Sequence, residues 1–222
     1  MKIFLDTADC EQIQKHFASG LIDGVTTNPT LIMKSHRKPD DVYQELKDMG
    51  LTDISMEVVA DTFLATVKEA HRLHEKFGEV TTIKVPCTPD GLQACHDLAK
   101  EGIKVNVTLI FSQVQAILAA KAGATYVSPF VGRVDDNSFG GLCLVKDIAK
   151  VFREHMARTQ VLAASIRGAR DVGRAFEYGA DIVTMPVGVF EKCYKHILTD
   201  KGLELFDLDW QSVQHANPSV VQ

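Results

Sequence analysis

The segment Val80-Thr81-Thr82-Ile83-Lys84-Val85-Pro86 indicates both the fold and the chemistry of this chain. It is rich in β-branched residues and ends in proline, which is typical of a short, fully buried β-strand. Lys84 lies inside this apolar run, where burial disfavours the charged ammonium. A neutral lysine amine is a nucleophile that can form a Schiff base with a carbonyl compound. A strand-end lysine that reaches back to water is the alternative interpretation, and the surrounding sequence argues against it.

Strand-like segments of this kind alternate with amphipathic, helix-like segments along the chain. We predict strands at residues 2–6, 23–27, 53–59, 80–85, 103–109, 125–130, 160–164 and 181–185. We predict helices at residues 8–19, 40–49, 61–78, 89–101, 111–123, 141–156, 168–178 and 187–198. Eight such units predict an α/β fold, the (β/α)8 TIM barrel. The alternative is an open doubly wound sheet, and no G-x-G-x-x-G follows the first strand to favour its dinucleotide-binding form.

Glycines and an extra apolar segment complete this organisation. Gly24, Gly102, Gly123 and Gly179 precede strands, where the C-cap glycine of a helix is expected. We predict one barrel domain over residues 1–222, with residues 201–222 as a C-terminal helical tail. The apolar side chains of this tail would pack either against the bottom face of the same barrel or against a neighbouring subunit.

Composition restricts the partners of the chain. A net charge of -5 without a basic block argues against nucleic acid as a partner. We find neither an apolar run long enough to span a bilayer nor the pattern of a secretory signal, so no membrane association is expected. The five scattered cysteines suit free thiols in a reducing cytoplasm better than a disulfide framework.

Polar or charged residues lie near the ends of seven successive predicted strands, the position of catalytic groups in such a barrel. Taken singly, Asp6 or Asn28 could be a helix N-cap, Thr108 could bind local backbone, and Arg133 could be a surface charge. Seven strand ends together are harder to explain in this way. The candidate site residues are Asp6, Thr27, Asn28, Glu57, Lys84, Asn106, Thr108, Phe130, Arg133, Ser165 and Arg167.

These residue types fit one reaction class. Schiff-base chemistry at Lys84 needs proton transfers, for which Glu57 and Asp6 are the candidate acid/base groups. Amide and hydroxyl side chains can bind the hydroxyl groups of a substrate, and two guanidinium groups beside a serine can hold a phosphate. The candidates for these contacts are Asn28, Asn106, Ser165, Arg133 and Arg167. The sequence therefore predicts an enzyme that acts on the carbonyl of a sugar phosphate.

Several motifs carry a resemblance to a known family. They are Phe4-Leu5-Asp6-Thr7-Ala8, Gly24-Val25-Thr26-Thr27-Asn28-Pro29-Thr30-Leu31, Ile83-Lys84-Val85-Pro86, Asn106-Val107-Thr108-Leu109-Ile110-Phe111-Ser112 and Leu162-Ala163-Ala164-Ser165-Ile166-Arg167. Over nearly its whole length the chain resembles the transaldolase family, and its short length is similar to the compact branch that includes fructose-6-phosphate aldolase. The Thr-Thr-Asn-Pro segment is a specific signature.

This resemblance implies a role for each candidate. Lys84 would be the Schiff-base lysine, and Asp6 the acid/base of carbon–carbon cleavage. Glu57 and Thr108 would position a catalytic water. The substrate-binding set would be Asn28 and Asn106 for the donor hydroxyls, Arg133, Ser165 and Arg167 for the phosphate, and Thr27 and Phe130 beside them. Neither a metal nor a cofactor is implied. Compact members form ring-like decamers in which the C-terminal helix reaches a neighbour, which implies a homo-oligomer such as a decamer of pentameric rings.

Two positions bear on the branch of the family. The compact aldolases resemble this chain but carry glutamine at the position of Glu57 and tyrosine at that of Phe130. The resemblance therefore favours a transaldolase of the pentose phosphate pathway, which transfers a dihydroxyacetone unit between sugar phosphates. A lysine-dependent aldolase that releases free dihydroxyacetone is the alternative. A catalytically silent sugar-phosphate-binding barrel would be expected to have lost Lys84 or its partners, and an intact site argues against a purely structural ring.

Overall fold

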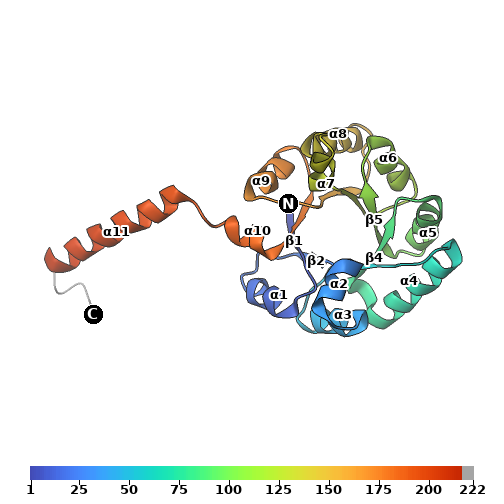
Figure 1. The fold of residues 1–222 in the computed structure, drawn as a ribbon, viewed down its shortest axis with the longest axis horizontal. Helices are drawn as coiled ribbons and strands as arrows, with labels where there is room; N and C mark the ends of the chain where they lie inside the picture. The colour runs from blue at the N-terminus through green and yellow to red at the C-terminus, as the bar shows by residue number, and fades with distance from the viewer. Residues whose placement is uncertain (217–222) are drawn as a thin grey trace.

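Eight parallel strands close into a barrel in the computed structural model, which describes residues 1–216 of the chain. Each strand pairs with the next in chain order, and the last strand pairs with the first (Figure 1). The strands are β1 Lys2–Asp6, β2 Gly24–Thr26, β3 Ile54–Glu57, β4 Thr81–Pro86, β5 Lys104–Ile110, β6 Tyr126–Pro129, β7 Gln160–Ala163 and β8 Ile182–Met185. The predicted (β/α)8 barrel is confirmed, and an open sheet is excluded.

Helices surround the barrel on its outside, and the last helix, α11 Ile197–Ala216, extends away from it (Figure 1). The other helices are α1 Cys10–Phe17, α2 Pro29–Ser35, α3 Pro39–Asp48, α4 Phe63–Phe77, α5 Pro89–Lys100, α6 Gln113–Lys121, α7 Val131–Asp136, α8 Gly141–Glu154, α9 Ala169–Glu177 and α10 Val187–Lys192, with a short 3-10 helix at Gly78–Val80. Helices α2 and α7 were not predicted. Both begin at the carboxyl end of a strand, so they place residues directly beside the mouth of the barrel.

The boundaries of these elements follow from local chemistry. Several helices begin at a side chain that accepts a hydrogen bond from the first turn, namely at Asp9, Asn28, Thr62, Thr88 and Ser112. Gly102, Gly123 and Gly179 have positive φ angles of 82°, 92° and 95° just after α5, α6 and α9, as predicted for C-cap glycines.

Gly24 is a correction to that prediction. It is the first residue of β2 and does not cap a helix. A Cβ at this position would lie 2.7 Å from the carbonyl oxygen of Asp53 and 2.7 Å from the ring of Phe4. Only glycine therefore lets the Phe4 ring fill the interior of the barrel at this level.

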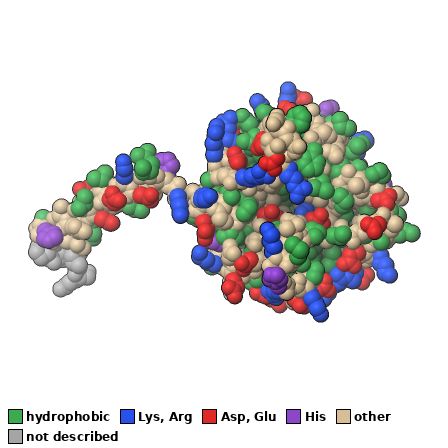
Figure 2. Space-filling model, viewed as in Figure 1, with side chains coloured by type: hydrophobic (Ala, Val, Ile, Leu, Met, Phe, Trp, Pro, Cys, Tyr) green, Lys and Arg blue, Asp and Glu red, His purple; other side chains and the backbone are tan. Residues whose placement is uncertain are grey.

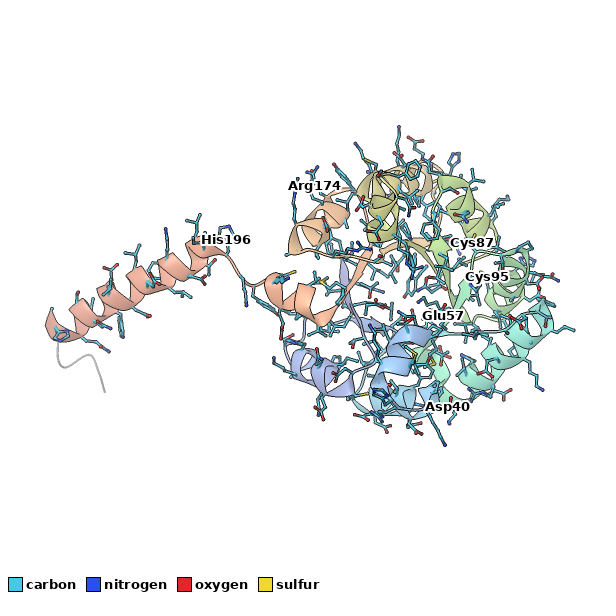
Figure 3. All side chains as sticks on the ribbon, viewed as in Figure 1. Asp40, Glu57, Cys87, Cys95, Arg174 and His196 are labelled. Carbon is cyan, nitrogen blue, oxygen red and sulfur yellow. The ribbon has the colours of Figure 1, made fainter. Side chains whose placement is uncertain are left out.

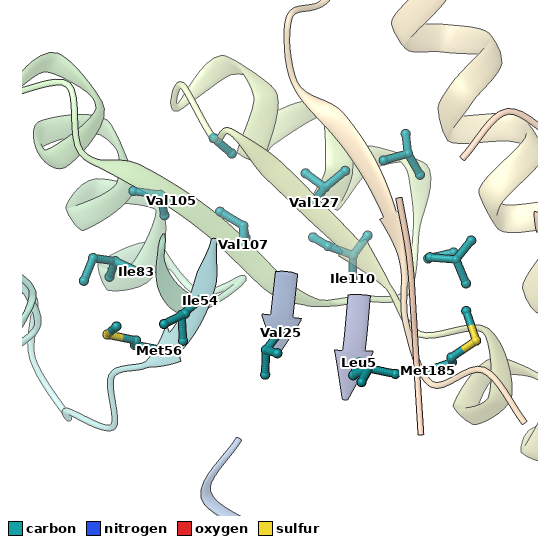
Figure 4. Packing of buried hydrophobic residues seen from close by; sticks show 14 of the residues in the cluster. Leu5, Val25, Ile54, Met56, Ile83, Val105, Val107, Ile110, Val127 and Met185 are labelled. Atoms are coloured by element: carbon teal, nitrogen blue, oxygen red, sulfur yellow. The ribbon is translucent and has the colours of Figure 1, made fainter. Parts of the chain in front are cut away.

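Two apolar clusters hold the fold together. The larger lies between the strands and the helices, where Leu5, Val25, Ile54, Met56 and Ile83 are among its fully buried members (Figure 4). The smaller cluster consists of Phe4, Tyr126, Leu162, Ala164 and Ile182. Because side chains alternate along a strand, the residues between the members of the larger cluster face the barrel axis. On β2 to β5 many of these inward residues are polar, and they build the site described below.

The last helix differs from the predicted tail. The predicted helix at residues 187–198 is divided: α10 ends at Lys192, and α11 begins at Ile197 rather than at residue 201. Helix α11 extends away from the barrel and contains no buried residue (Figures 1 and 2). Packing of this tail against the bottom face of its own barrel was therefore a wrong alternative. The final residues of the predicted tail, 217–222, lie outside the described part.

Within residues 1–216, no helix has both the length and the apolar character that crossing a bilayer requires.

Candidate active site

Lys84 lies inside the barrel near the carboxyl ends of the strands, with only 5% of its surface exposed. Its Nζ donates a 2.9 Å hydrogen bond to Oε2 of Glu57 and another of 2.9 Å to the carbonyl oxygen of Thr27. Strand register sets this pairing, because Glu57 of β3 and Lys84 of β4 are directly opposite each other. In Figure 3, Glu57 lies toward the centre of the barrel. Lys84 is therefore not a strand-end lysine that returns to water.

Two acceptors lie within hydrogen-bond distance of the Lys84 amine, a carboxylate and a carbonyl. The amine attacks a carbonyl carbon only as the unprotonated nucleophile, so a neighbouring group must accept its proton. Glu57 is the group in contact with Lys84 that can accept it.

Asp6 provides a second carboxyl group at the end of β1. Its Oδ1 accepts a 2.7 Å hydrogen bond from the hydroxyl of Thr26, which in turn lies 2.7 Å from the hydroxyl of Thr184 on β8. Burial raises the pKa of the Asp6 carboxyl, although the Thr26 hydrogen bond and the positive charge of Lys84 oppose this shift. A carboxyl that holds its proton at higher pH than usual is suited to act as a general acid and base.

A cavity of about 100 Å³ joins these groups at the mouth of the barrel. Its lining includes six of the predicted site residues, from β1, β4 and the segments that follow β2, β6 and β7. They are Asp6, Asn28, Lys84, Phe130, Arg133 and Ser165. Glu57 lines a neighbouring depression between α2, α3 and α4, together with Asn28. The cavity therefore has an amine, a carboxyl group and a guanidinium group within one small volume.

Two further predicted residues are buried on β5, and neither lines this cavity. Asn106 is fully buried, donates a 3.2 Å hydrogen bond to the Ser55 hydroxyl and accepts one of 2.7 Å from the Ser128 hydroxyl. Thr108 is 1% exposed, and its hydroxyl has no hydrogen-bond partner among the described residues. A buried hydroxyl without a partner is unusual and leaves one polar group available for a ligand or a water.

Thr27 contributes only backbone to the site. Its hydroxyl donates a 2.9 Å hydrogen bond to the carbonyl of Ser55 and lies 3.3 Å from the hydroxyl of Tyr43 on α3. The side chain thus faces the surrounding helices, as strand alternation requires when the neighbouring Thr26 faces the axis. The carbonyl of Thr27 is the part that contacts Lys84.

Asn28 has the capping role that the sequence left open, and it also lines the cavity. Its Oδ1 accepts a 3.0 Å hydrogen bond from the backbone N–H of Leu31 and so caps α2. The amide nitrogen of Asn28 donates no hydrogen bond within the described residues. This amide can therefore serve as a hydrogen-bond donor to a ligand in the cavity.

The two predicted phosphate-binding arginines differ in their surroundings. Arg133 comes from α7, and its guanidinium lies 4.8 Å from the centre of the Phe130 ring, at the cavity. Arg167 follows β7 and forms a bidentate ion pair with Asp136 at the end of α7. The Arg167 guanidinium lowers the pKa of that carboxyl. A phosphate that binds Arg167 would have to share it with Asp136 or replace it.

Close packing holds α7 against the end of β7. The N–H of Gly132 donates a 3.0 Å hydrogen bond to the carbonyl of Ser165, whose φ of +58° is in the left-handed region. A Cβ at Gly132 would lie 2.4 Å from that carbonyl oxygen and 2.6 Å from Nε of Arg167. Gly132 therefore allows the approach, and the strained backbone of Ser165 is typical of a ligand-binding position.

Sequence reasoning missed four residues of this arrangement. Thr26, Ser128 and Thr184 line the cavity, and Asp136 binds Arg167. Strand alternation could have identified both Thr26 and Ser128. Thr26 lies two residues before Asn28, and Ser128 lies two residues before Phe130, so each faces the same side as a predicted site residue. Thr184 is on β8, which supplied no predicted candidate. No group of three or more His, Cys, Asp and Glu side chains in residues 1–216 is arranged to bind a metal ion.

Comparisons with known proteins agree with one another. The family described as "Transaldolase/Fructose-6-phosphate aldolase" matches residues 3–218. A protein named "Probable transaldolase" from Nitrosopumilus maritimus is 48% identical over 221 residues, which is 99% of each chain. A protein of the same name from Kosmotoga olearia is 53% identical over 211 residues, 95% of this chain and 96% of its own. Another from Anaeromyxobacter sp. strain K is 50% identical over 97% of this chain and 99% of its own.

Proposed function

The chain belongs to the transaldolase/fructose-6-phosphate aldolase family, and we propose that it transfers a dihydroxyacetone unit between sugar phosphates through a Schiff base on Lys84. The donor would be a ketose phosphate, fructose 6-phosphate or sedoheptulose 7-phosphate. The acceptor would be an aldose phosphate, erythrose 4-phosphate or glyceraldehyde 3-phosphate. One observation carries this proposal: a buried lysine amine in contact with Glu57 opens into a cavity that also contains Asp6 and Arg133.

Glu57 serves the formation of the Schiff base. It takes a proton from the Lys84 ammonium, and the amine attacks the ketone carbon of the donor. The resulting carbinolamine loses water when a proton is delivered to its hydroxyl, and Glu57 can deliver it directly or through a water. Thr108 lies on the neighbouring strand β5, and its hydroxyl, which has no hydrogen-bond partner among residues 1–216, could hold such a water.

Asp6 serves the carbon–carbon bond. It accepts the proton of the hydroxyl next to the scissile bond, the bond breaks, and its electron pair moves into the imine to give an enamine on Lys84. The aldose phosphate leaves with a new carbonyl group. An acceptor aldehyde then takes its place, the enamine attacks it, and Asp6 returns the proton to the new alkoxide. The raised pKa of Asp6 supports this double role.

The remaining candidates bind the substrates. Asn28 and Asn106 would hold the donor hydroxyls, although Asn106 already uses both of its polar atoms on Ser55 and Ser128. Arg133, Ser165 and Arg167 would hold the phosphate. Arg133 supports this role most directly, since it lies at the cavity and has no carboxylate within ion-pair distance among the described residues.

Transfer and simple aldol cleavage differ in the fate of the enamine. Transfer requires it to wait for an aldehyde, whereas an aldolase protonates and hydrolyses it promptly. Phe130 at the cavity has no hydroxyl that could donate a proton or hold a water, which favours transfer. A lysine-dependent aldolase that releases free dihydroxyacetone is therefore the second candidate.

One incubation separates the two functions. The protein is incubated with fructose 6-phosphate, with and without erythrose 4-phosphate, and the products are identified by mass spectrometry. Transfer predicts sedoheptulose 7-phosphate and glyceraldehyde 3-phosphate only when the acceptor is present. If the protein released dihydroxyacetone from fructose 6-phosphate as fast as it transferred the unit to erythrose 4-phosphate, the aldolase would replace the transferase proposal. A silent sugar-phosphate-binding barrel would give no product in either mixture.

The exposed apolar side chains of α11 support a homo-oligomer. Leu205, Phe206, Leu208 and Trp210 are each more than half exposed. Hydrophobic side chains lie along the surface of this helix (Figure 2). Four large apolar side chains on one projecting helix favour contact with a second chain. A decamer of pentameric rings is the expected assembly by resemblance.

Light scattering tests this assembly. Phe206→Glu should lower the particle mass, while Glu204→Gln, a neighbouring change that leaves the apolar side chains in place, should not. An unchanged mass for Phe206→Glu would count against α11 as the interface.

We propose a cytoplasmic setting for the enzyme. The five cysteines are free thiols in the structure, which fits a reducing cytoplasm. The proposed substrates would place the reaction in the pentose phosphate pathway.

A further inference from the structure

We propose that Thr184 is a positioning residue that acts through Thr26 to fix which oxygen of Asp6 carries the transferable proton. The three side chains come from β8, β2 and β1, which are neighbours in the barrel. The inference rests on the proposed acid/base role of Asp6, and it adds two hydroxyl groups to the machinery of that step.

The geometry forms an unbranched chain of hydrogen bonds. The hydroxyls of Thr184 and Thr26 are 2.7 Å apart, and the Thr26 hydroxyl is 2.7 Å from Oδ1 of Asp6. Both threonines are 2% exposed, and both line the cavity with Asp6. Oδ2 of Asp6 has no hydrogen-bond partner among residues 1–216. The carboxyl group thus has one oxygen bound to the barrel wall and one that is free.

Counting protons gives the chain a direction. If Asp6 carried its proton on Oδ1, that proton would go to Thr26, the proton of Thr26 would go to Thr184, and Thr184 would need an acceptor of its own. Within the described residues Thr184 has no other hydrogen-bond partner. A buried hydroxyl proton without an acceptor is unfavourable, so Thr184 donates to Thr26 and Thr26 donates to Oδ1.

This direction has a consequence for catalysis. With Oδ1 always an acceptor, a proton taken from the substrate hydroxyl must bind Oδ2. In cleavage, the O–H bond of the substrate breaks, an O–H bond forms at Oδ2, and the electrons of the scissile carbon–carbon bond enter the imine of Lys84. In the addition step, where the enamine attacks the acceptor aldehyde, the same proton returns from Oδ2 to the new alkoxide. The protons of Thr26 and Thr184 stay in place throughout.

The pKa of Asp6 can report on the hydrogen bonds from Thr184 and Thr26, once the charges around Asp6 are taken into account. Lys84 on β4 and Arg133 on α7 favour its ionised form, and Glu57 on β3 favours the protonated form. The Thr26 hydrogen bond also lowers the pKa of Asp6, against the larger effect of burial. Removing the Thr184 hydroxyl weakens Thr26 as a donor, because its oxygen no longer accepts a hydrogen bond. The pKa of Asp6 should then rise further.

Four variants test the chain in the cleavage half-reaction. Thr184→Val keeps the shape without the hydroxyl, and should reduce the rate about fivefold, as for one neutral hydrogen bond. It should also move the acid limb of the pH–rate profile to higher pH, since cleavage needs ionised Asp6. Thr184→Ser, which keeps the hydroxyl, should retain both values. Thr26→Val should have the larger effect, and adding Thr184→Val to it should change nothing more.

Other results would overturn the proposal. They are a Thr184→Val enzyme with the rate and pH profile of the parent, a Thr184→Ser enzyme as impaired as Thr184→Val, or additive effects in the double variant. The matched control is Thr81→Val, which removes a buried hydroxyl of β4 that has no partner in the described part of the chain. Its rate should match the parent.

A second measurement does not depend on activity. The carboxyl carbon of Asp6 is followed by 13C NMR in aspartate-labelled protein and assigned with Asp6→Asn. Its titration midpoint should rise in Thr184→Val and stay in place in Thr184→Ser. A parent protein without transferase activity would refute the proposed function, while this titration would still decide whether the threonine chain controls Asp6.

Discussion

Asp53 and Asp6 lie at opposite ends of the barrel interior, and their surroundings differ in one respect. Asp53, at the start of β3, accepts hydrogen bonds of 2.8 Å from Thr82 and 2.7 Å from Tyr126, and Lys104 lies 3.3 Å away. Burial, followed by the negative charge of Asp53, raises the pKa of the Tyr126 hydroxyl, which keeps this donor protonated. We call these four side chains, Asp53, Thr82, Lys104 and Tyr126, the lower network, and each of them has a hydrogen-bond or ion-pair partner within it.

The upper network, at the carboxyl ends of the strands, consists of Asp6, Thr26, Thr108 and Lys84. It has the same residue types, but part of their hydrogen-bonding capacity is unused. Asp6 binds Thr26 through one oxygen only, the Thr108 hydroxyl has no partner in residues 1–216, and Lys84 faces a cavity. Aspartate, threonine and lysine thus close the barrel at one end and can perform chemistry at the other. The difference is whether their hydrogen-bonding capacity is filled by the protein or left for a substrate.

The largest expected effect comes from removing the amine at the upper end. Lys84→Met should abolish transfer, because no other group can form the imine, while the similar volume leaves the melting temperature near that of the parent. Borohydride with fructose 6-phosphate should add a reduced donor fragment to Lys84 in the parent and none in the variant, as read by peptide mass spectrometry. Labelling at any other residue would contradict the assignment.

The converse change is at the lower end. Asp53→Asn places an amide N–H among donors and should lower the free energy of unfolding by about 2–4 kcal/mol. The kcat of the folded protein should stay close to the parent value, because the partners of the Asp53 side chain, Thr82, Lys104 and Tyr126, do not line the cavity. Urea titration measures the first quantity and initial rates the second. Tyr126→Phe, which removes a single donor, is the milder control. A large loss of kcat in folded Asp53→Asn would show that the two networks are coupled.

A smaller effect is expected at the rim of the upper end. Arg133→Ala should raise KM for phosphorylated substrates about tenfold, as for one lost charged hydrogen-bond pair. The rise in KM should be smaller for unphosphorylated donors of the dihydroxyacetone type. Arg167→Ala should act in the same direction but more weakly, because Asp136 already binds this guanidinium. Equal losses on both kinds of substrate would indicate a structural role.

The smallest expected effect is a change in product ratio. Phe130→Tyr adds one hydroxyl at the cavity and should shift the ratio of transfer to dihydroxyacetone release by a few-fold toward release, with little change in stability. The ratio is measured with and without erythrose 4-phosphate. Phe111→Tyr, on the neighbouring ring, is a matched control that should leave the ratio unchanged. An unchanged ratio in Phe130→Tyr would remove Phe130 from the choice between transfer and release.

The sequence predicted the barrel well because its signal is local. The strands are short segments rich in β-branched and other apolar residues, and most of the longer helices have a regular apolar face, so their alternation could be read without knowledge of contacts. The short helices α2 and α7 were missed because they follow strands directly and have few turns in which a pattern can develop. Gly24 was misread as a helix cap because the need for glycine at this position comes from the ring of Phe4, which is twenty residues away in the sequence.

The candidate site was predictable to the extent that residue chemistry and strand ends define it. Six predicted residues meet at one cavity. The outward direction of the Thr27 hydroxyl could also have been predicted from strand alternation. What the sequence could not give depends on distant partners, since the Asp136–Arg167 pair joins residues far apart in sequence. The acceptors around Lys84 likewise come from other parts of the chain, namely Glu57 on β3 and the carbonyl of Thr27 just after β2.

Helix α11 has a consequence for how the stability of this protein depends on dilution. Its 20 residues extend about 30 Å, and none of them is buried within the chain. In the proposed oligomer, the free energy gained by covering its apolar side chains is intermolecular and enters the unfolding equilibrium through mass action. The melting temperature should therefore rise with protein concentration, whereas a chain that buried the same helix on itself would melt at one temperature at every concentration.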